Sequence, residues 1–361
     1  MVLAVALSRG ADAAPQDIGV AFRFAPRDAP EATRTGEIRV RGALALDRGV
    51  GSTAMPREIS GLAWSADDRI LYAVTDGGQL LLLRPRLSHG DLVGLSLLAV
   101  HPLADTDGVP LGSGATDAEG LAVLDGADGR TGNTRLLISF EGRPLLAEHA
   151  PDGRRRRVLT LPGGLADARL YAGGNQGLEA LAWHPDHGVV VAPEHPLRGE
   201  AGSAVTLHAG DGATWRYFVE NVDEQSITGL DTLPDGSLLA LERRYSHPWL
   251  PVVITISRLR LDDDGLVATP LARFSSAEGW PVDNFEAIAW HRGNRFFIAS
   301  DDNASPWQRA LLVYLEFSEP GARRRSALEQ ARHQLDQVAR PRPVVELGAD
   351  QHVPTGGAGA R

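Results

Sequence analysis

The sequence of 361 residues contains no cysteine, which excludes disulfide bonds, thiol nucleophiles and thiolate metal sites. It also contains no lysine, so all 36 basic residues are arginine. Schiff-base chemistry and lysine-based phosphate loops are therefore excluded. Any anion that a basic side chain recognises here must be met by arginine, which can hold a phosphate through two parallel hydrogen bonds.

Long apolar stretches and excess positive charge are absent as well. No run approaches the roughly 20 residues that a membrane helix needs, so we expect no membrane span. The net charge of −10 argues against a nucleic-acid partner and is compatible with the binding of cations. The hydrophobic content of 43% is that of an ordinary globular protein, which we expect to be a monomer.

The two ends of the chain differ in composition from its middle. Residues 1–36 are rich in Ala, Pro and Arg and predict a loosely ordered segment. The start MVLAVALSRGADAAPQ has a short apolar stretch followed by a pattern similar to a signal-peptide cleavage site, although the basic region that usually precedes one is missing. On this basis we expect a periplasmic or secreted protein. Residues 319–361 predict a surface helix followed by a disordered tail.

The middle of the chain, residues 37–318, repeats one pattern five times. Each repeat has a strand of the type GLAW, a turn rich in Asp, Asn and Gly, and a second, more apolar strand. The aligned positions stand about 50 to 60 residues apart. They are Ser60, Glu119, Glu179, Thr228 and Glu286.

Further strand candidates complete each repeat to four, which is the pattern of a β-propeller blade. The last repeat lacks a fourth strand, and residues 37–46 could supply it and close the ring. The sequence thus predicts an all-β propeller of five four-stranded antiparallel blades. Six blades remain an alternative if a weak one lies within residues 195–226, and a β-sandwich fits the repeats less well.

Acidic residues recur at two positions of the repeats. In an antiparallel hairpin the start of the first strand lies beside the end of the second, so both positions should meet at one mouth of the central channel. The ends of the second strands give one set: Asp76, Glu141, Glu194, Glu242 and Asp301. The first strands give a set closer to the axis: Glu119, Glu179 and Glu286, with Glu58 nearby.

Crowded carboxylates are costly unless a positive charge lies among them. The candidates are Ca²⁺, which takes six to eight oxygen ligands, and an arginine such as Arg143, Arg243 or Arg244. The structural alternative is that these acids only anchor loops. His195 follows Glu194 and is a candidate ligand or acid/base, whereas no GxSxG, HExxH or Walker motif is present.

Two segments carry a resemblance to a known family. The residues Asp283-Asn284-Phe285-Glu286, followed by Ser300-Asp301-Asp302-Asn303, resemble the C-terminal signature of the phytase-like family, whose activity is described as esterase-like. DAEGLAV, NQGLEALAW and LLALERRYS fit the same pattern, so the resemblance covers roughly residues 50–318. The chain departs from the family at Ala180 and Ala287, where glycine is usual. The resemblance implies a β-propeller, often exported, that hydrolyses ester bonds.

The leading hypothesis is a metal-assisted phosphoric-ester hydrolase that acts on a small-molecule phosphate ester or another ester. Calcium is the expected cofactor, with ligands from Glu58, Glu119, Glu179, Glu286 and Asp301. The substrate would be held by Arg143, Arg243, Arg244 and Asn303, and protons moved by Asp302 and His195. The alternative is a non-catalytic propeller that binds a ligand or protein partner over the same face. A metal-independent carboxylesterase is disfavoured because no serine elbow is present.

Overall fold

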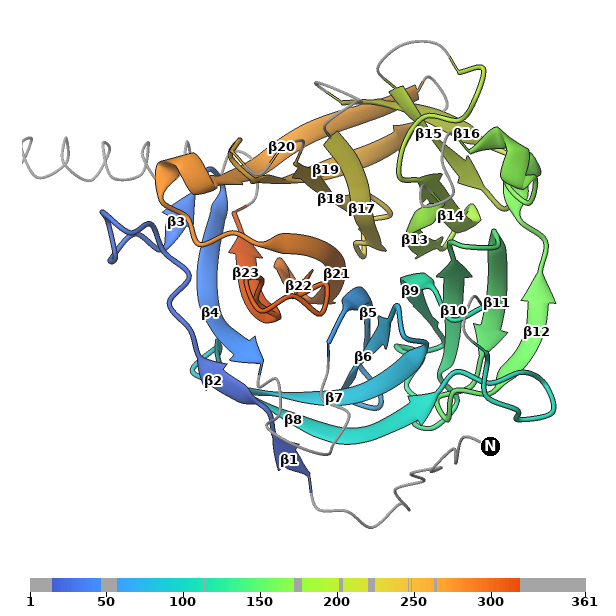
Figure 1. Cartoon of the computed structure of the whole chain (residues 1–361), viewed down its shortest axis with the longest axis horizontal. Coiled ribbons are helices and arrows are strands. Elements are labelled where there is room, and N and C mark those ends of the chain that lie inside the picture. Colours follow the sequence, from blue (N-terminus) through green and yellow to red (C-terminus); the bar gives the residue numbers. More distant parts are fainter. Residues whose placement is uncertain are drawn as a thin grey trace, which may run out of the picture. The chain divides into compact units, whose positions relative to one another are not determined.

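The computed structural model describes residues 15–46, 57–112, 115–171, 177–200, 204–219, 225–245, 247, 249–262 and 265–318. They form five antiparallel sheets arranged as the blades of a propeller, so the five-bladed prediction is confirmed (Figure 1). The predicted C-terminal helix lies outside the described residues. None of the helices in the described part has the length and hydrophobicity of a membrane span.

The first three blades follow one another in the chain. The strands of blade 1, from the axis outward, are β5 (Ile59–Ser65), β6 (Ile70–Thr75), β7 (Gln79–Ser88) and β8 (Asp91–Pro102). Those of blade 2 are β9 (Ala118–Leu124), β10 (Arg135–Phe140), β11 (Leu145–His149) and β12 (Arg155–Leu159). Those of blade 3 are β13 (Leu178–His184), β14 (Gly188–Pro193), β15 (Ala204–Ala209) and β16 (Thr214–Phe218).

Blade 4 completes the regular series and blade 5 closes the ring. The strands of blade 4 are β17 (Gln225–Thr232), β18 (Leu238–Arg244), β19 (Val253–Asp262) and β20 (Gly265–Ser275). Those of blade 5 are β21 (Asn284–Arg292), β22 (Arg295–Asp301), β23 (Leu311–Phe317) and, from the N-terminal side of the chain, β4 (Ile38–Leu46). The ring is therefore closed by the segment predicted for this role.

The N-terminal residues strengthen this closure. β1 (Gln16–Asp17) pairs with the outer strand of blade 1, while β2 (Gly19–Ala21) and β3 (Arg34–Thr35) pair with β4 of blade 5. Ile18, between β1 and β2, is 1% exposed. Residues 15–36, for which composition alone predicted loose packing, thus link the first and last blades.

Five buried apolar clusters lie between neighbouring blades, and together they form the core. Blades 4 and 5 share one cluster, and blades 5 and 1 share another. The interfaces between blades 3 and 4, 2 and 3, and 1 and 2 each hold one more. Strands buried on both faces explain the nearly continuous apolar runs of the sequence, such as LLALE and FFIAS. This rigid ring fixes the positions of the side chains at its centre.

Candidate functional site

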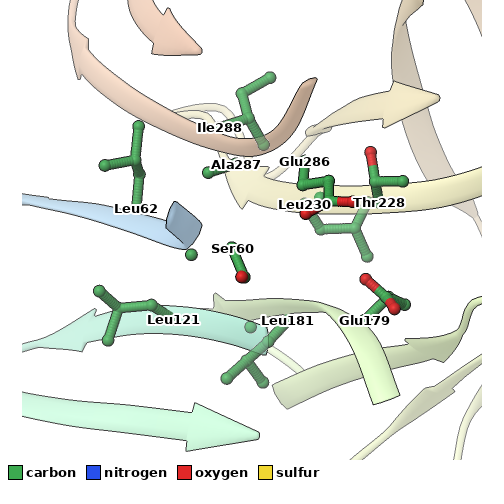
Figure 2. A pocket seen from close by; sticks show the side chains of 13 residues that line it. Ser60, Leu62, Leu121, Glu179, Leu181, Thr228, Leu230, Glu286, Ala287 and Ile288 are labelled. Carbon is green, nitrogen blue, oxygen red and sulfur yellow. The ribbon is translucent and has the colours of Figure 1, made fainter. Parts of the chain in front are cut away.

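Each of the five innermost strands carries a β-bulge at the same place. The pairing register skips one residue in β5, β9, β13, β17 and β21. The skipped residues are Ser60, Glu119, Glu179, Thr228 and Glu286. A bulge redirects one side chain out of the sheet's alternation. Figure 2 shows Ser60, Glu179, Thr228 and Glu286 gathered from four strands around one cavity on the axis.

Below the bulges the channel is nearly closed. The residue after each bulge is small, and a Cβ on Gly61 would lie 2.5 Å from the backbone oxygen of Glu119, so neighbouring inner strands are very close there. The next residues are apolar and only 2–3% exposed: Leu62, Leu121, Leu181, Leu230 and Ile288 (Figure 2). The cavity at this level measures about 10 Å³, room for about one water molecule. The mouth of the channel is therefore a depression, called the acidic cup below, whose floor is this apolar ring.

A second ring of charged residues stands where the second strand of each blade ends. In each blade, the position meant is the one after the second-strand residue that pairs just before the bulge, for example the position after Thr75, which pairs with Ile59. These five equivalent positions hold four acids and one arginine. They are Asp76, Glu141, Glu194, Arg243 and Asp301.

The prediction that Glu242 belongs to this ring is wrong by one residue. Glu242 points into blade 4, where it accepts hydrogen bonds from Tyr217, Gln225 and Ser257, the last at 2.9 Å. Successive residues of a strand face opposite sides, so Arg243 takes the place in the mouth.

Above the floor, the mouth opens into a pocket of about 890 Å³. The acids that line it come from blades 1, 2 and 3 on one side and from blade 5 on the other. The acids are Asp76, Glu119, Glu141, Glu179, Glu194, Asp283, Glu286 and Asp301. Arg243 and Arg309 also line it, together with Asn284, Asn303 and several uncharged residues.

On the side of blades 4 and 5, Arg243 pairs with two acids of the pocket. The Arg243 guanidinium donates to Glu286 at 2.5 Å, to Glu194 at 3.4 Å and to the Asn284 side-chain oxygen. Burial works against the charged guanidinium, but the carboxylates of Glu286 and Glu194 outweigh it and raise the pKa of Arg243. Arg243 thus ties together side chains from blades 3, 4 and 5.

On the side of blades 1, 2 and 3 the acids other than Glu194 have no such partner. Carboxylate oxygens of Asp76, Asp117 and Glu119 lie within 4.8 Å of one another, and so do those of Glu119, Glu141 and Glu179. Within the described residues, no arginine forms an ion pair with any of these five. Glu119 belongs to both groups and is 7% exposed, and its side-chain carboxylate accepts no hydrogen bond from a described residue. These two groups of carboxylates could hold metal ions.

The pKa values of these carboxyl groups reflect the crowding. Burial, followed by the charges of neighbouring acids, raises the pKa of Glu119 and of Glu179 well above the ordinary value. Burial also raises the pKa of Asp76 to about 6 and that of Glu141 to about 7. Such a cluster is costly when ionised, and a bound cation would offset the repulsion.

The five predicted metal ligands divide between the pocket and its edge. Glu119, Glu179, Glu286 and Asp301 all line the pocket. Glu58 does not, but its backbone oxygen accepts from the N–H of Asp76 at 3.2 Å and its charge adds to the pKa shift of Asp76. Asp117 was missed by the sequence analysis. It stands two residues before the bulge, as Glu58 and Asn284 do in their blades, so a full repeat alignment could have found it.

The predicted acid/base residues lie outside the pocket lining. Asp302 is fully buried, accepts from the backbone N–H of Glu58 at 3.3 Å and lies 3.5 Å from Arg57. His195 Nε2 lies 3.7 Å from Glu194. Asp301, next to Asp302, does line the pocket and accepts from the N–H of Asn303 at 2.7 Å.

Of the predicted substrate-binding residues, Arg243 and Asn303 line the pocket. Arg143 is exposed on the loop after β10, and Arg244 is half-buried at the end of β18. Neither of these two arginines is part of the pocket lining.

Comparison with known proteins identifies one matching family. Residues 57–304 match the family model called phytase-like, described as esterase-like activity of phytase. A search of curated proteins found no match. Among solved structures, a luciferin-regenerating enzyme aligns at 8% identity with a TM-score of 0.39, over 73% of this chain and 92% of its own. A gluconolactonase from Xanthomonas campestris aligns at 17% identity with a TM-score of 0.36, over 85% and 96%. Similarity this low carries no functional argument.

Proposed function

Since the chain belongs to the phytase-like family, which is described by an esterase-like activity, we propose that it is a calcium-assisted hydrolase of phosphate esters acting in the acidic cup. One observation supports this above the others: Glu119, shared by two groups of carboxylates, is buried without a hydrogen-bond donor or an arginine in the described part of the chain. A buried carboxylate in that position is costly unless a cation binds it.

The donor set fits calcium. Every side chain in the two groups offers carboxylate oxygen, the ligand that hard cations such as Ca²⁺ prefer. Calcium could be held by either group: by Glu119 with Asp76 and Asp117, or by Glu119 with Glu141 and Glu179. When bound there, calcium supplies a positive charge that stabilises negative oxygens of the ester and of the attacked phosphorus centre.

Other residues of the pocket position the acids or exchange protons. Asp301 lines the pocket, and Asn303 and Asn284 hold its carboxyl group through hydrogen bonds of 2.7 and 3.3 Å. Burial, then the charge of Glu286, raises the pKa of Asp301 to about 8, so this group can take up or release a proton near neutral pH. Arg243 is engaged with Glu286 and Glu194, so it positions those acids rather than the substrate phosphate. The apolar floor excludes water from below.

The experiment is hydrolysis of 4-nitrophenyl phosphate by EDTA-treated protein with and without added calcium. We expect turnover only with calcium, and a loss of at least about 1,000-fold in kcat/KM in Glu119→Gln, because the shared ligand is removed while the side-chain shape is kept. Circular dichroism would check that the variant is folded. Full turnover in EDTA, or in Glu119→Gln, would contradict the proposal. Calcium binding without turnover on any phosphate ester would favour the ligand-binding propeller.

A further inference from the structure

Exposed aromatic side chains stand on the side of the pocket formed by blades 4 and 5. Tyr245 directly follows β18 and is 50% exposed. Trp307 lies in the segment between β22 and β23 and is 90% exposed. Both line the same pocket as the acids, together with the apolar Val252 and Val282. The wall of the pocket on the side of blades 4 and 5 thus carries aromatic and apolar side chains beside its charged and polar ones.

The segment that carries Trp307 is held at both ends. The N–H of Ser305 donates to the backbone oxygen of Asp302 at 2.7 Å, and the N–H of Trp307 donates to Ser305 Oγ at 3.3 Å. On the other side of the tryptophan, the N–H of Arg309 donates to Asp283 at 3.1 Å. Trp307 is thus a large apolar side chain that an anchored loop of the pocket lining presents to solvent.

The size of the pocket shows what kind of occupant fits. Its volume of about 890 Å³ lies at the upper end of the roughly 300–1,000 Å³ typical of sites for drug-sized molecules. A phosphate group and its cations would occupy only the acidic side. The space next to Tyr245 and Trp307 is therefore available to the organic part of the ester, and it is continuous with the acidic site.

We propose, resting on the proposed function, that Tyr245 and Trp307 bind an apolar, ring-bearing organic group of the substrate. The preferred substrates are then amphipathic phosphate esters, such as aryl esters, rather than small and fully hydrophilic ones. The ring of the substrate gains contact with the aromatic side chains in stacked or edge-to-face geometry, and apolar surface is removed from water on both partners.

The test compares two non-hydrolysable probes by calorimetry in excess calcium: naphthylmethylphosphonate and methylphosphonate. The wild-type protein should bind the naphthyl probe at least about tenfold more tightly. Trp307→Ala and Tyr245→Ala should each weaken naphthyl binding by about fivefold and leave methylphosphonate binding unchanged. Phe218→Ala is the matched control, because Phe218 is 65% exposed at the end of β16 and does not line the pocket, and it should change neither.

Turnover of naphthyl phosphate and glycerol phosphate separates this inference from the proposed function. A naphthyl preference that Trp307→Ala removes, without hydrolysis of either ester, would support the aromatic site and defeat the hydrolase proposal. Calcium-dependent hydrolysis with equal kcat/KM for both esters, unchanged in Trp307→Ala, would overturn the aromatic site and leave the hydrolase standing. Absence of binding by both phosphonates would also overturn the aromatic site.

Discussion

The two sides of the mouth are built from the same repeated positions but solve the problem of crowded charge differently. On the side of blades 4 and 5, the second-strand position of blade 4 holds Arg243, which pairs with Glu286 and Glu194. In blades 1 and 2 the corresponding positions hold Asp76 and Glu141, and the described residues provide no arginine for them. One side carries its own cation, whereas on the other side we propose that calcium from solution takes this role.

This difference shows how a site can form in a symmetric propeller when equivalent positions of the blades hold different residues. Five equivalent bulges supply five equivalent side-chain positions, and function depends on which residue occupies each. Thr228 in blade 4 uses its hydroxyl to donate to the backbone oxygen of Phe285 at 3.1 Å, which adds no charge. The two groups of carboxylates without an arginine come from blades 1 to 3.

The largest effect is expected when the internal cation, Arg243, is removed. Arg243→Ala leaves Glu286 and Glu194 largely buried without their partner, and should lower the free energy of unfolding by about 3 kcal/mol in EDTA. Calcium should restore part of that stability, because the paired side would now resemble the unpaired one. Urea denaturation with and without calcium measures both effects.

Arg143→Ala is the control, since Arg143 is exposed and forms no ion pair with a described residue; its cost should stay within about 0.5 kcal/mol. If Arg243→Ala were no more destabilising than Arg143→Ala, the pairing on this side would be energetically unimportant.

A smaller effect is expected when the pH is changed. Burial raises the pKa of Asp301 to about 8, those of Glu141 and Glu286 to about 7 and that of Asp76 to about 6, from ordinary values of 3.8 for Asp and 4.5 for Glu. Between these ordinary values and about pH 8 the folded protein binds more protons than the unfolded chain. The free energy of unfolding therefore decreases as the pH rises through this window.

We expect the Tm in EDTA to fall by at least about 5 °C from pH 5 to pH 8. Saturating calcium should reduce this dependence, since a cation replaces the protons. A Tm in EDTA that is constant or rises over this range would mean that the acids are not crowded in solution.

Much of this architecture could be predicted from the sequence because the repeats carry the signal. Turn residues at the midpoint between Glu286 and Asp301 placed both at one mouth, and the missing fourth strand of the last repeat indicated closure by residues 37–46. These inferences need only strand alternation and hairpin geometry.

What could not be predicted depends on shifts of a single residue and on contacts between blades. Glu242 and Arg243 are neighbours in the sequence, yet the register of β18 sends one into the blade and the other into the mouth. Asp301 and Asp302 divide in the same way between pocket and interior. The pairing of Arg243 with acids from two other blades follows only from the closed ring.

The most direct test of the unpaired cation site is calcium binding by calorimetry on EDTA-stripped protein, comparing the wild type with Glu119→Gln and Glu194→Gln. We predict a site of about micromolar affinity that weakens at least about 100-fold in Glu119→Gln and less than about tenfold in Glu194→Gln, because Glu119 belongs to both carboxylate groups and Glu194 to neither. Absence of calcium binding by the wild type, or equal losses in both variants, would contradict this prediction.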